Sequence, residues 1–397
     1  MNLLMISDPP GSGYGTQTEN ILLELKKHNI NSIWCFINAR GKTGSLYTYK
    51  GIKCFNAGFT NNDNIYNIYF LLKSGIDLNM ILILHDPRFI EFFFRHLYNI
   101  VECPIIYWHL WDNFPVPEFN FPLYRSSDAV VCGSYFTYKL LKDKLDVGYI
   151  PLSVDTKSYY PVNVKDVLKN YASKLDIKLT EKSFVVGAMH RNIKRKRLFD
   201  ILKIFNRFKK DKKDCLLVLK TDPYDYMGFP LLEDESLLGD DVIFVSSFLT
   251  QREMCLLYNI MNVHIDISLA EGFGMTVLES LSCGVPNVVS YTGGLRYHKD
   301  VLKVGDEYSI VYPKVTMESG FQPKVYINQD YVSEQDVILA LNKIYHKFRY
   351  GLTEDKKIDI HNKIDKHYGI ENVTKSLLAL FNNVQKKKKI YYREEIF

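Results

Sequence analysis

The chain has 397 residues, 47% of them hydrophobic and 24% charged, and a formal net charge of +5. This length suits two domains of ordinary size, and the composition excludes a disordered or fibrous chain. The net charge is too small to indicate nucleic-acid binding by itself, and no segment approaches the roughly 18 apolar residues of a membrane-spanning helix.

The first 150 residues alternate between short apolar strands and helices. The predicted strands cover residues 3–6, 32–37, 80–84, 105–108, 129–131 and 148–150. The first helix is predicted over residues 16–27, with Thr16 and Glu19 as a capping box at its start. Such alternation is typical of a parallel sheet with helices on both faces. The sequence therefore predicts an N-terminal α/β domain over residues 1–155.

The same alternation restarts after a less regular segment, residues 156–183, which we interpret as an interdomain connection. The predicted strands are 184–189, 216–219, 242–245, 263–267 and 287–290, and the predicted helices are 198–208, 251–260, 333–348 and 369–381. A second α/β domain is thus expected over residues 184–366. A helix at 367–385 that packs back on the first domain and a basic tail at 386–397 complete the prediction.

The loop after the strand at 263–267 carries two acids eight positions apart, Glu271 and Glu279, with a glycine-rich turn between them. Apolar residues after the turn repeat at helical spacing, which places the turn at a helix N-terminus, where free N–H groups favour anions. Glu279, one turn into the helix, can face the same spot as Glu271. Two acids beside an anion site suit a ligand with both phosphates and hydroxyls, such as a nucleotide sugar.

The stretch from Ala270 to Gly274, followed by the stretch from Leu278 to Pro286, resembles glycosyltransferase family 4. Its members are retaining, metal-independent enzymes with an E-x7-E motif and the GT-B fold, in which two Rossmann-like domains face a cleft. The resemblance implies hexose transfer from a UDP- or GDP-sugar to an acceptor hydroxyl on a glycan, a lipid or a protein-linked sugar. It implies neither a cofactor nor a metal.

The resemblance also implies roles for residues of this loop. Glu271 would engage the donor sugar as a catalytic residue, and Glu279 would bind the nucleotide ribose. The backbone amides expected around the donor sugar and phosphate are those of Phe273, Gly274, Met275 and Thr276.

Five lysine or arginine residues fall within the eight positions from His190 to Arg197, between a strand and a helix. Cations at a helix N-terminus oppose the helix dipole unless an anion binds there. The resemblance assigns Arg191 and Lys196 to the donor diphosphate and leaves Lys194 and Arg195, like Arg197, as candidates for simple solvation. A nucleic-acid or nuclear-import patch is the alternative interpretation.

A glycine-rich loop, Gly11 to Thr16, follows the first strand and lets backbone amides approach a phosphate. It does not fit a dinucleotide site, since no acid follows the second strand. The resemblance places Gly13 and Gly15 on the donor phosphate and Tyr14 on the acceptor side. A tight turn without a ligand is the alternative.

The loop after the strand at 105–108 holds His109, Trp111 and Asp112. The resemblance implies that His109 lies near the donor sugar as a second catalytic residue, and that Trp111 and Asp112 line the acceptor pocket. His85 competes for the histidine role. Each histidine could instead be a structural strand-end residue, and Trp111 could simply pack under its loop.

The seven cysteines form no C-x-x-C pair, which is typical of reduced thiols in a cytoplasmic protein. The Lys386–Lys389 run suits either peripheral contact with acidic lipid or a solvated tail. Nucleic acid is not an expected partner, and the oligomeric state stays open. A GT-B nucleotide-sugar epimerase and a non-catalytic sugar- or partner-binding module remain as alternative functions.

Overall fold

The computed structural model describes residues 1–163, 179, 182–212, 214–322 and 325–387. The chain forms two units, one made of Met1–Ser153 with Ile370–Phe397 and the other of Val154–Gly369. Most of the expected interdomain connection, and the basic tail from residue 388 onward, lie outside the described residues.

The first unit is built on an eight-stranded sheet with the order β3-β4-β2-β1-β5-β6-β7-β8. Its strands are β1 (Asn2–Ser7), β2 (Asn31–Ile37), β3 (Leu46–Tyr49), β4 (Ile52–Gly58), β5 (Met80–Ile83), β6 (Ile105–His109), β7 (Ala129–Cys132) and β8 (Gly148–Tyr149). Every neighbouring pair is parallel except β3 and β4. The sequence analysis predicts neither strand of the β3–β4 hairpin. β3 is mostly exposed to solvent and gives no apolar pattern, whereas β4 is buried.

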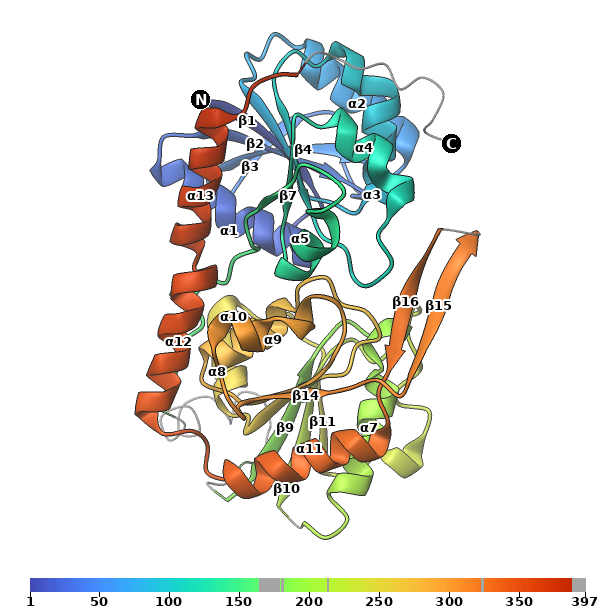
Figure 1. The fold of residues 1–397 in the computed structure, drawn as a ribbon, viewed down its shortest axis with the longest axis vertical. Coiled ribbons are helices and arrows are strands. Elements are labelled where there is room, and N and C mark those ends of the chain that lie inside the picture. The colour runs from blue at the N-terminus through green and yellow to red at the C-terminus, as the bar shows by residue number, and fades with distance from the viewer. Residues whose placement is uncertain (164–178, 180–181, 213, 323–324, 388–397) are drawn as a thin grey trace. The chain divides into compact units, whose positions relative to one another are not determined.

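Helices flank this sheet. They are α1 (Gly13–Lys27), α2 (Asn61–Lys73), α3 (Pro87–Phe92), α4 (Phe121–Ser126), α5 (Tyr135–Leu141) and α13 (Ile370–Asn383), with the short helices η1 (Phe93–Leu97), η2 (Tyr98–Ile100) and η3 (Glu118–Asn120). Helix α13 runs beside α1 (Figure 1). The predicted start of the first helix is wrong: α1 begins at Gly13, and the Ser12 hydroxyl caps it by accepting a hydrogen bond from the Gly15 amide. Thr16 therefore already lies inside the helix.

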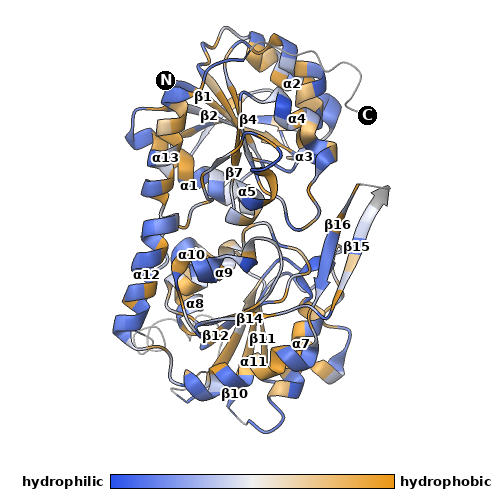
Figure 2. Cartoon of the chain, in the orientation of Figure 1, coloured by the Kyte–Doolittle hydropathy of each residue, from blue (hydrophilic) through white to orange (hydrophobic). Residues whose placement is uncertain are grey.

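The second unit contains a six-stranded parallel sheet with the order β11-β10-β9-β12-β13-β14. Its strands are β9 (Phe184–Met189), β10 (Cys215–Lys220), β11 (Val242–Val245), β12 (Val263–Asp266), β13 (Asn287–Ser290) and β14 (Tyr308–Val311). The bounds predicted for β9, β11 and β13 are confirmed. The apolar strand runs that made these predictions possible form the cores of both units, seen as the hydrophobic strands in Figure 2.

Helices of the second unit are α7 (Leu198–Phe208), α8 (Gln251–Asn259), α9 (Met275–Ser282), α10 (His298–Leu302), α11 (Glu334–Lys347) and α12 (Glu354–Tyr368), with η5 (Lys194–Lys196), η6 (Glu235–Leu237) and η7 (Gly293–Arg296). The bounds predicted for α7 are confirmed. Helix α12 is missed by the sequence pattern, because it is largely hydrophilic (Figure 2) and its fully buried aliphatic residues are only Ile360 and Ile364.

An antiparallel hairpin, β15 (Val315–Gln322) and β16 (Val325–Tyr331), extends from the second unit (Figure 1). It is anchored by Asp330, whose amide donates to the Leu269 carbonyl at 2.8 Å. The Asp330 carboxylate also accepts hydrogen bonds from Arg296, at 2.9 Å, and from Thr316, at 2.7 Å. The base of the hairpin is thereby attached to the loop that follows β12.

All seven cysteines are free thiols, and six of them are buried. Within the described residues, no helix is both long and apolar enough to cross a membrane.

The strand order reverses once in each sheet, between β1 and β5 and between β9 and β12. In open parallel sheets, ligands bind beyond the carboxyl ends of the strands at such a reversal. The loops after these four strands are therefore where a functional site is expected.

Candidate functional site

In the second unit, the loops after β9 and β12 bring one acid and two cations into contact. The Glu271 carboxylate, through Oε2, lies 2.5 Å from the Lys196 Nζ and 2.8 Å from the Arg195 Nη1. Arg195 and Lys196 come from η5 after β9, and Glu271 follows β12. Because β9 and β12 are hydrogen-bonded neighbours, residues 75 positions apart in sequence meet at one edge of the sheet.

Glu271 is held in its ionised form. Burial alone would raise its pKa, but the Lys196 ammonium and the Arg195 guanidinium outweigh this effect and lower the pKa to about 2. The other carboxylate oxygen accepts a hydrogen bond from the Gly274 amide at 3.2 Å. The Glu271 side chain is therefore a fixed, charged hydrogen-bond acceptor in the loop after β12.

A second acid, Asp266, lies at the end of β12, close to Lys196. It is fully buried, and its carboxylate is 3.5 Å from Lys196 Nζ and 3.8 Å from His190 Nε2. Burial would raise the pKa of Asp266, but Lys196, His190 and hydrogen bonds from Ser268 together lower it. The sequence pattern misses Asp266, because a single acid at the end of an apolar strand gives no distinct signal.

Two other cations of the basic loop, Arg191 and Arg197, also have acid partners, so the loop is not simply a free basic patch. Arg191 lies at the surface and pairs with Asp225 at 2.6 Å. Arg197 is buried and donates to Asp200 at 2.8 Å. The prediction that Arg195 and Arg197 are simply solvated is wrong, since Arg195 pairs with Glu271 and the buried Arg197 pairs with Asp200, three positions further on. Among Lys194, Arg195 and Arg197, only Lys194 is exposed.

The turn between the two acids leads directly into α9. Gly274 caps the helix with a φ of +84°, while Met275 and Thr276 form its first turn, where backbone N–H groups have no partner within the helix. Phe273 is buried, and its carbonyl accepts a hydrogen bond from His298 Nε2 at 2.6 Å. Burial lowers the pKa of His298 to about 4, so the histidine is neutral at pH 7. The turn is thus held by the His298 hydrogen bond and leads directly into the first turn of α9.

Replacing Gly274 with alanine is expected to destabilise the protein by about 2–4 kcal/mol, because of its left-handed backbone and a severe side-chain contact. A Cβ at this position would lie 2.4 Å from Leu295 Cδ2. Gly13→Ala is the matched control, since a Cβ there meets open space. Urea unfolding of the two variants measures the difference, and equal midpoints would contradict this account of the turn.

Glu279 lies one turn into α9 and is 7% exposed. Its Oε2 accepts a hydrogen bond from the Tyr258 hydroxyl at 2.8 Å. Burial raises its pKa to about 7; the Tyr258 hydrogen bond opposes that shift and the charge of Asp155 adds to it. Glu279 thus differs from Glu271, because no cation offsets its burial.

In the first unit, the glycine-rich loop is partly structural. A Cβ on Gly15 would lie 1.9 Å from the Pro9 carbonyl oxygen, so this residue is required by a close backbone approach. Gly13 faces open space. The Tyr14 ring lies 5.6 Å from that of His85, and His85 Nε2 is 2.8 Å from Asp8 Oδ1. The loops after β1 and β5 therefore meet in an Asp8–His85 pair beside Tyr14.

His109 closes β6 and is fully buried. Its Nε2 is 2.8 Å from the Tyr124 hydroxyl, and burial lowers its pKa to about 3. The ring of Trp111 lies 6.3 Å away, and its indole N–H donates to the Pro115 carbonyl at 2.9 Å. These contacts fit the structural strand-end histidine that the sequence left open, while the buried Nδ1 has no hydrogen-bond partner among the described residues. The catalytic role of His109 stays a prediction. Asp112 follows in the same loop and is partly exposed.

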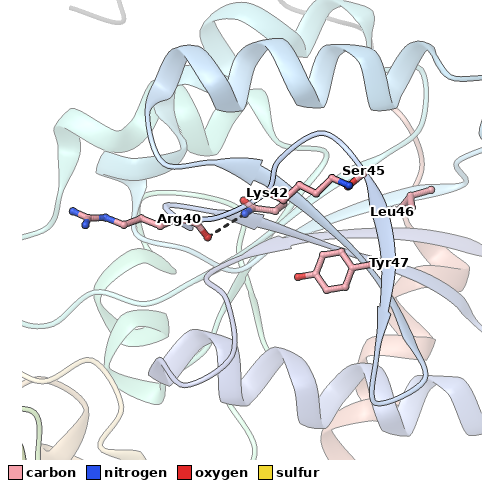
Figure 3. A pocket seen from close by; sticks show the side chains of 6 residues that line it. Arg40, Lys42, Ser45, Leu46 and Tyr47 are labelled. Atoms are coloured by element: carbon pink, nitrogen blue, oxygen red, sulfur yellow. Dashed lines mark hydrogen bonds between the residues drawn. The ribbon is translucent and has the colours of Figure 1, made fainter.

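A pocket of about 430 Å³ also lies in the first unit, lined by Arg40, Lys42, Ser45, Leu46, Tyr47 and Asn56. Figure 3 shows that the guanidinium of Arg40 extends away from the other labelled side chains. It lies instead over the Phe59 ring, 4.9 Å from the centroid. The two cations do not converge, so the pocket has no built anion site.

Residues 172–303 match the family described as Glycosyl transferases group 1. A curated relative, probable sucrose-phosphate synthase of Thermosipho melanesiensis, is 29% identical over 40% of this chain and 34% of its own length. N-acetyl-alpha-D-glucosaminyl L-malate synthase of Bacillus anthracis is 24% identical over 46% of this chain and 45% of its own. The matches thus span less than half of each curated relative.

Solved structures match nearly the whole chain. Sucrose-phosphate synthase of Thermosynechococcus elongatus has a TM-score of 0.73 and 14% identity, covering 96% of this chain and 98% of its own. Anabaena HepE, in complex with UDP and glucose, has a TM-score of 0.71 and 14% identity, covering 96% and 99%. The two α/β units are those of the GT-B fold. The segment that matches Glycosyl transferases group 1 includes both Lys196 and Glu271.

Proposed function

We propose that the protein is a retaining glycosyltransferase that moves a hexose from a nucleoside diphosphate sugar to an acceptor hydroxyl. The observation that supports this most is the meeting of Glu271 with Lys196 and Arg195 at the strand-order reversal of the second unit. A donor of this class presents hydroxyls to an ionised carboxylate and phosphates to cations, and the site offers both.

In this proposal Lys196 and Arg191 bind the diphosphate and stabilise its charge as it leaves. Arg191 reaches it by exchanging Asp225, its present partner at the surface, for a phosphate oxygen. The amides at the start of α9 supply further fixed donors. Glu271 accepts hydrogen bonds from the sugar hydroxyls, and Glu279 accepts them from the ribose.

The donor and the acceptor are proposed from the similar proteins. Among the solved structures of this fold, HepE was crystallised with UDP and glucose, and an E. coli trehalose-6-phosphate protein with UDP-2-fluoro glucose. A UDP-hexose is accordingly the first donor to test. The relatives are named for different products, so the acceptor is left as a hydroxyl compound. Tyr14, Asp112 and Trp111 of the first unit are its proposed contacts.

The test is a screen of UDP- and GDP-hexoses for release of nucleoside diphosphate, first with water and then with a panel of sugar and lipid acceptors. We expect release from at least one donor, an acceptor product that keeps the donor's anomeric configuration, and full activity in the presence of a chelator. Inversion at the anomeric carbon, or a loss of activity that only magnesium restores, would refute the corresponding part of the proposal.

The same screen distinguishes the alternatives. An altered sugar formed without an acceptor would identify an epimerase. Tight donor binding without any turnover would identify a binding module.

The ribose role of Glu279 predicts a pH dependence of nucleoside binding. The free carboxyl has a pKa of about 7, and ribose hydroxyls donate to its ionised form, so binding lowers that pKa. Affinity for the nucleoside should then be full above pH 7 and fall by up to about tenfold per pH unit below it. Titration of uridine or guanosine avoids phosphate protonation, and Glu279→Gln should flatten the profile. A slope that survives this substitution would exclude the role.

A further inference from the structure

Arg195 is fixed to the loop after β12 by both its backbone and its side chain. Its carbonyl accepts a hydrogen bond from the Leu269 amide at 2.9 Å. Its Nη1 donates to the Ala270 carbonyl and, at 2.8 Å, to Glu271 Oε2. A guanidinium can serve two acceptors at once, which the ammonium of lysine cannot do in the same rigid geometry. These hydrogen bonds fix Arg195 in place, so its contact with Glu271 is fixed as well.

Lys196 is differently placed. Its ammonium is shared between Glu271, at 2.5 Å, and Asp266, at 3.5 Å, and an ammonium has three donors, so a third direction remains for a phosphate oxygen. A diphosphate bound there adds negative charge beside Glu271. A like charge at short range disfavours ionisation of a carboxyl group, so the bound donor would tend to protonate the acid that must accept hydrogen bonds from its sugar.

We propose that Arg195 is a positioning residue that keeps Glu271 ionised and aimed at the donor sugar while the diphosphate occupies Lys196. This inference rests on the proposed function. In this inference Arg195 acts through Glu271, because its Nη1 donates to the loop after β12, and the diphosphate is bound by Lys196 and Arg191.

The charges around Glu271 support this division of roles. The titratable groups that act on it, or that it acts on, come from four elements or loops: Arg195, Lys196, His190, Asp266 and His298. Both histidines have their pKa lowered to about 4 by burial, so they are neutral near pH 7 and offer no positive charge. Without Arg195, Lys196 would be the only cation of this group beside Glu271, and it would also have to serve Asp266 and the diphosphate.

The experiment compares Arg195→Gln and Arg195→Lys with Lys194→Gln, which removes an equal charge from an exposed position in the same loop. With the donor found in the screen, Arg195→Gln should lower kcat by about tenfold or more at pH 7, as expected for a lost charge-assisted hydrogen bond, with little change in KM. The acid limb of its kcat profile should move to higher pH. Arg195→Lys should fall between it and the wild type, and Lys194→Gln should match the wild type.

A second measurement does not depend on turnover. Calorimetric titration of UDP, or of GDP if that is the nucleotide bound, at pH 6 in two buffers of different ionisation enthalpy counts the protons taken up on binding. Arg195→Gln should take up more protons than the Arg195→Gln/Glu271→Gln double variant, whereas the wild type and Glu271→Gln should not differ. The double variant corrects for protonation of the phosphate itself.

Wild-type activity with an unchanged profile and unchanged proton uptake in Arg195→Gln would overturn the inference. A raised KM at constant kcat would also overturn it, by making Arg195 a donor ligand. If Arg195→Gln does not fold, the kcat profile and proton uptake of Arg195→Lys decide the matter in the same way. A wild type that releases nucleoside diphosphate from no donor would instead refute the proposed function.

Discussion

Replacing Lys196 with methionine is expected to lower nucleoside diphosphate affinity by at least about tenfold and the free energy of unfolding by about 3–5 kcal/mol. The first effect follows from the loss of a charge-assisted contact to the phosphate. The second follows from the burial of Asp266, which is fully enclosed and has Lys196 as its nearest cation. Calorimetric titration and urea unfolding measure the two effects.

A double variant separates these two effects. Adding Asp266→Asn to Lys196→Met removes the uncompensated buried charge, so stability should return in large part while diphosphate affinity stays low. Lys194→Met is the control for charge alone, because Lys194 is exposed and makes no ion pair in the described structure. Equal losses at Lys194 and Lys196 would favour a diffuse basic surface, and with it the nucleic-acid interpretation.

Glu271→Ala is expected to lower kcat by about 10²–10³, the usual effect of removing one fixed electrostatic partner of the transition state. Nucleoside diphosphate should bind as tightly as before or more tightly, because Arg195 and Lys196 lose the carboxylate that now neutralises them. Steady-state kinetics and UDP or GDP titration measure the split.

Glu279→Ala serves as the contrasting variant. It should mainly weaken nucleoside binding, by about 0.5–1.5 kcal/mol for a lost hydrogen bond, and leave kcat nearly unchanged. If both acids raised KM equally with kcat unaltered, the roles assigned to them would be wrong.

The sequence predicts five of the six strands of the second unit's parallel sheet, because they are continuous apolar runs, and it predicts α7, α8 and α11 from local signals. The capping box of Thr250 and Glu253 at the start of α8 is one such signal, and both of its hydrogen bonds are present. The hairpin β15–β16 gives a weaker signal, since its strands mix polar and apolar residues and pair only with each other. The short edge strand β3 is not predicted either, because it is mostly exposed.

The candidate site could be predicted in part. The motif around Glu271 and the basic loop around Lys196 were evident, and the parallel pairing of β9 with β12 brings them together. The partners of individual cations were not evident, because Arg191 pairs with Asp225, 34 positions away, and Arg195 with Glu271, 76 positions away. Such contacts depend on tertiary structure and leave no local pattern. The contact between His109 and Tyr124 likewise depends on tertiary structure and leaves no local pattern.

The anchoring of the β15–β16 hairpin has a practical consequence. Met317 is 55% exposed and stands next to Thr316, whose hydroxyl binds the Asp330 carboxylate, while the Asp330 amide holds Leu269 two residues before Glu271. A short hydrogen-bonded chain therefore connects the loop after β12 to an accessible surface position. A fluorophore attached through Met317→Cys would lie close enough to this chain to sense changes in that loop, which would give an optical assay for ligands that needs no acceptor and no turnover.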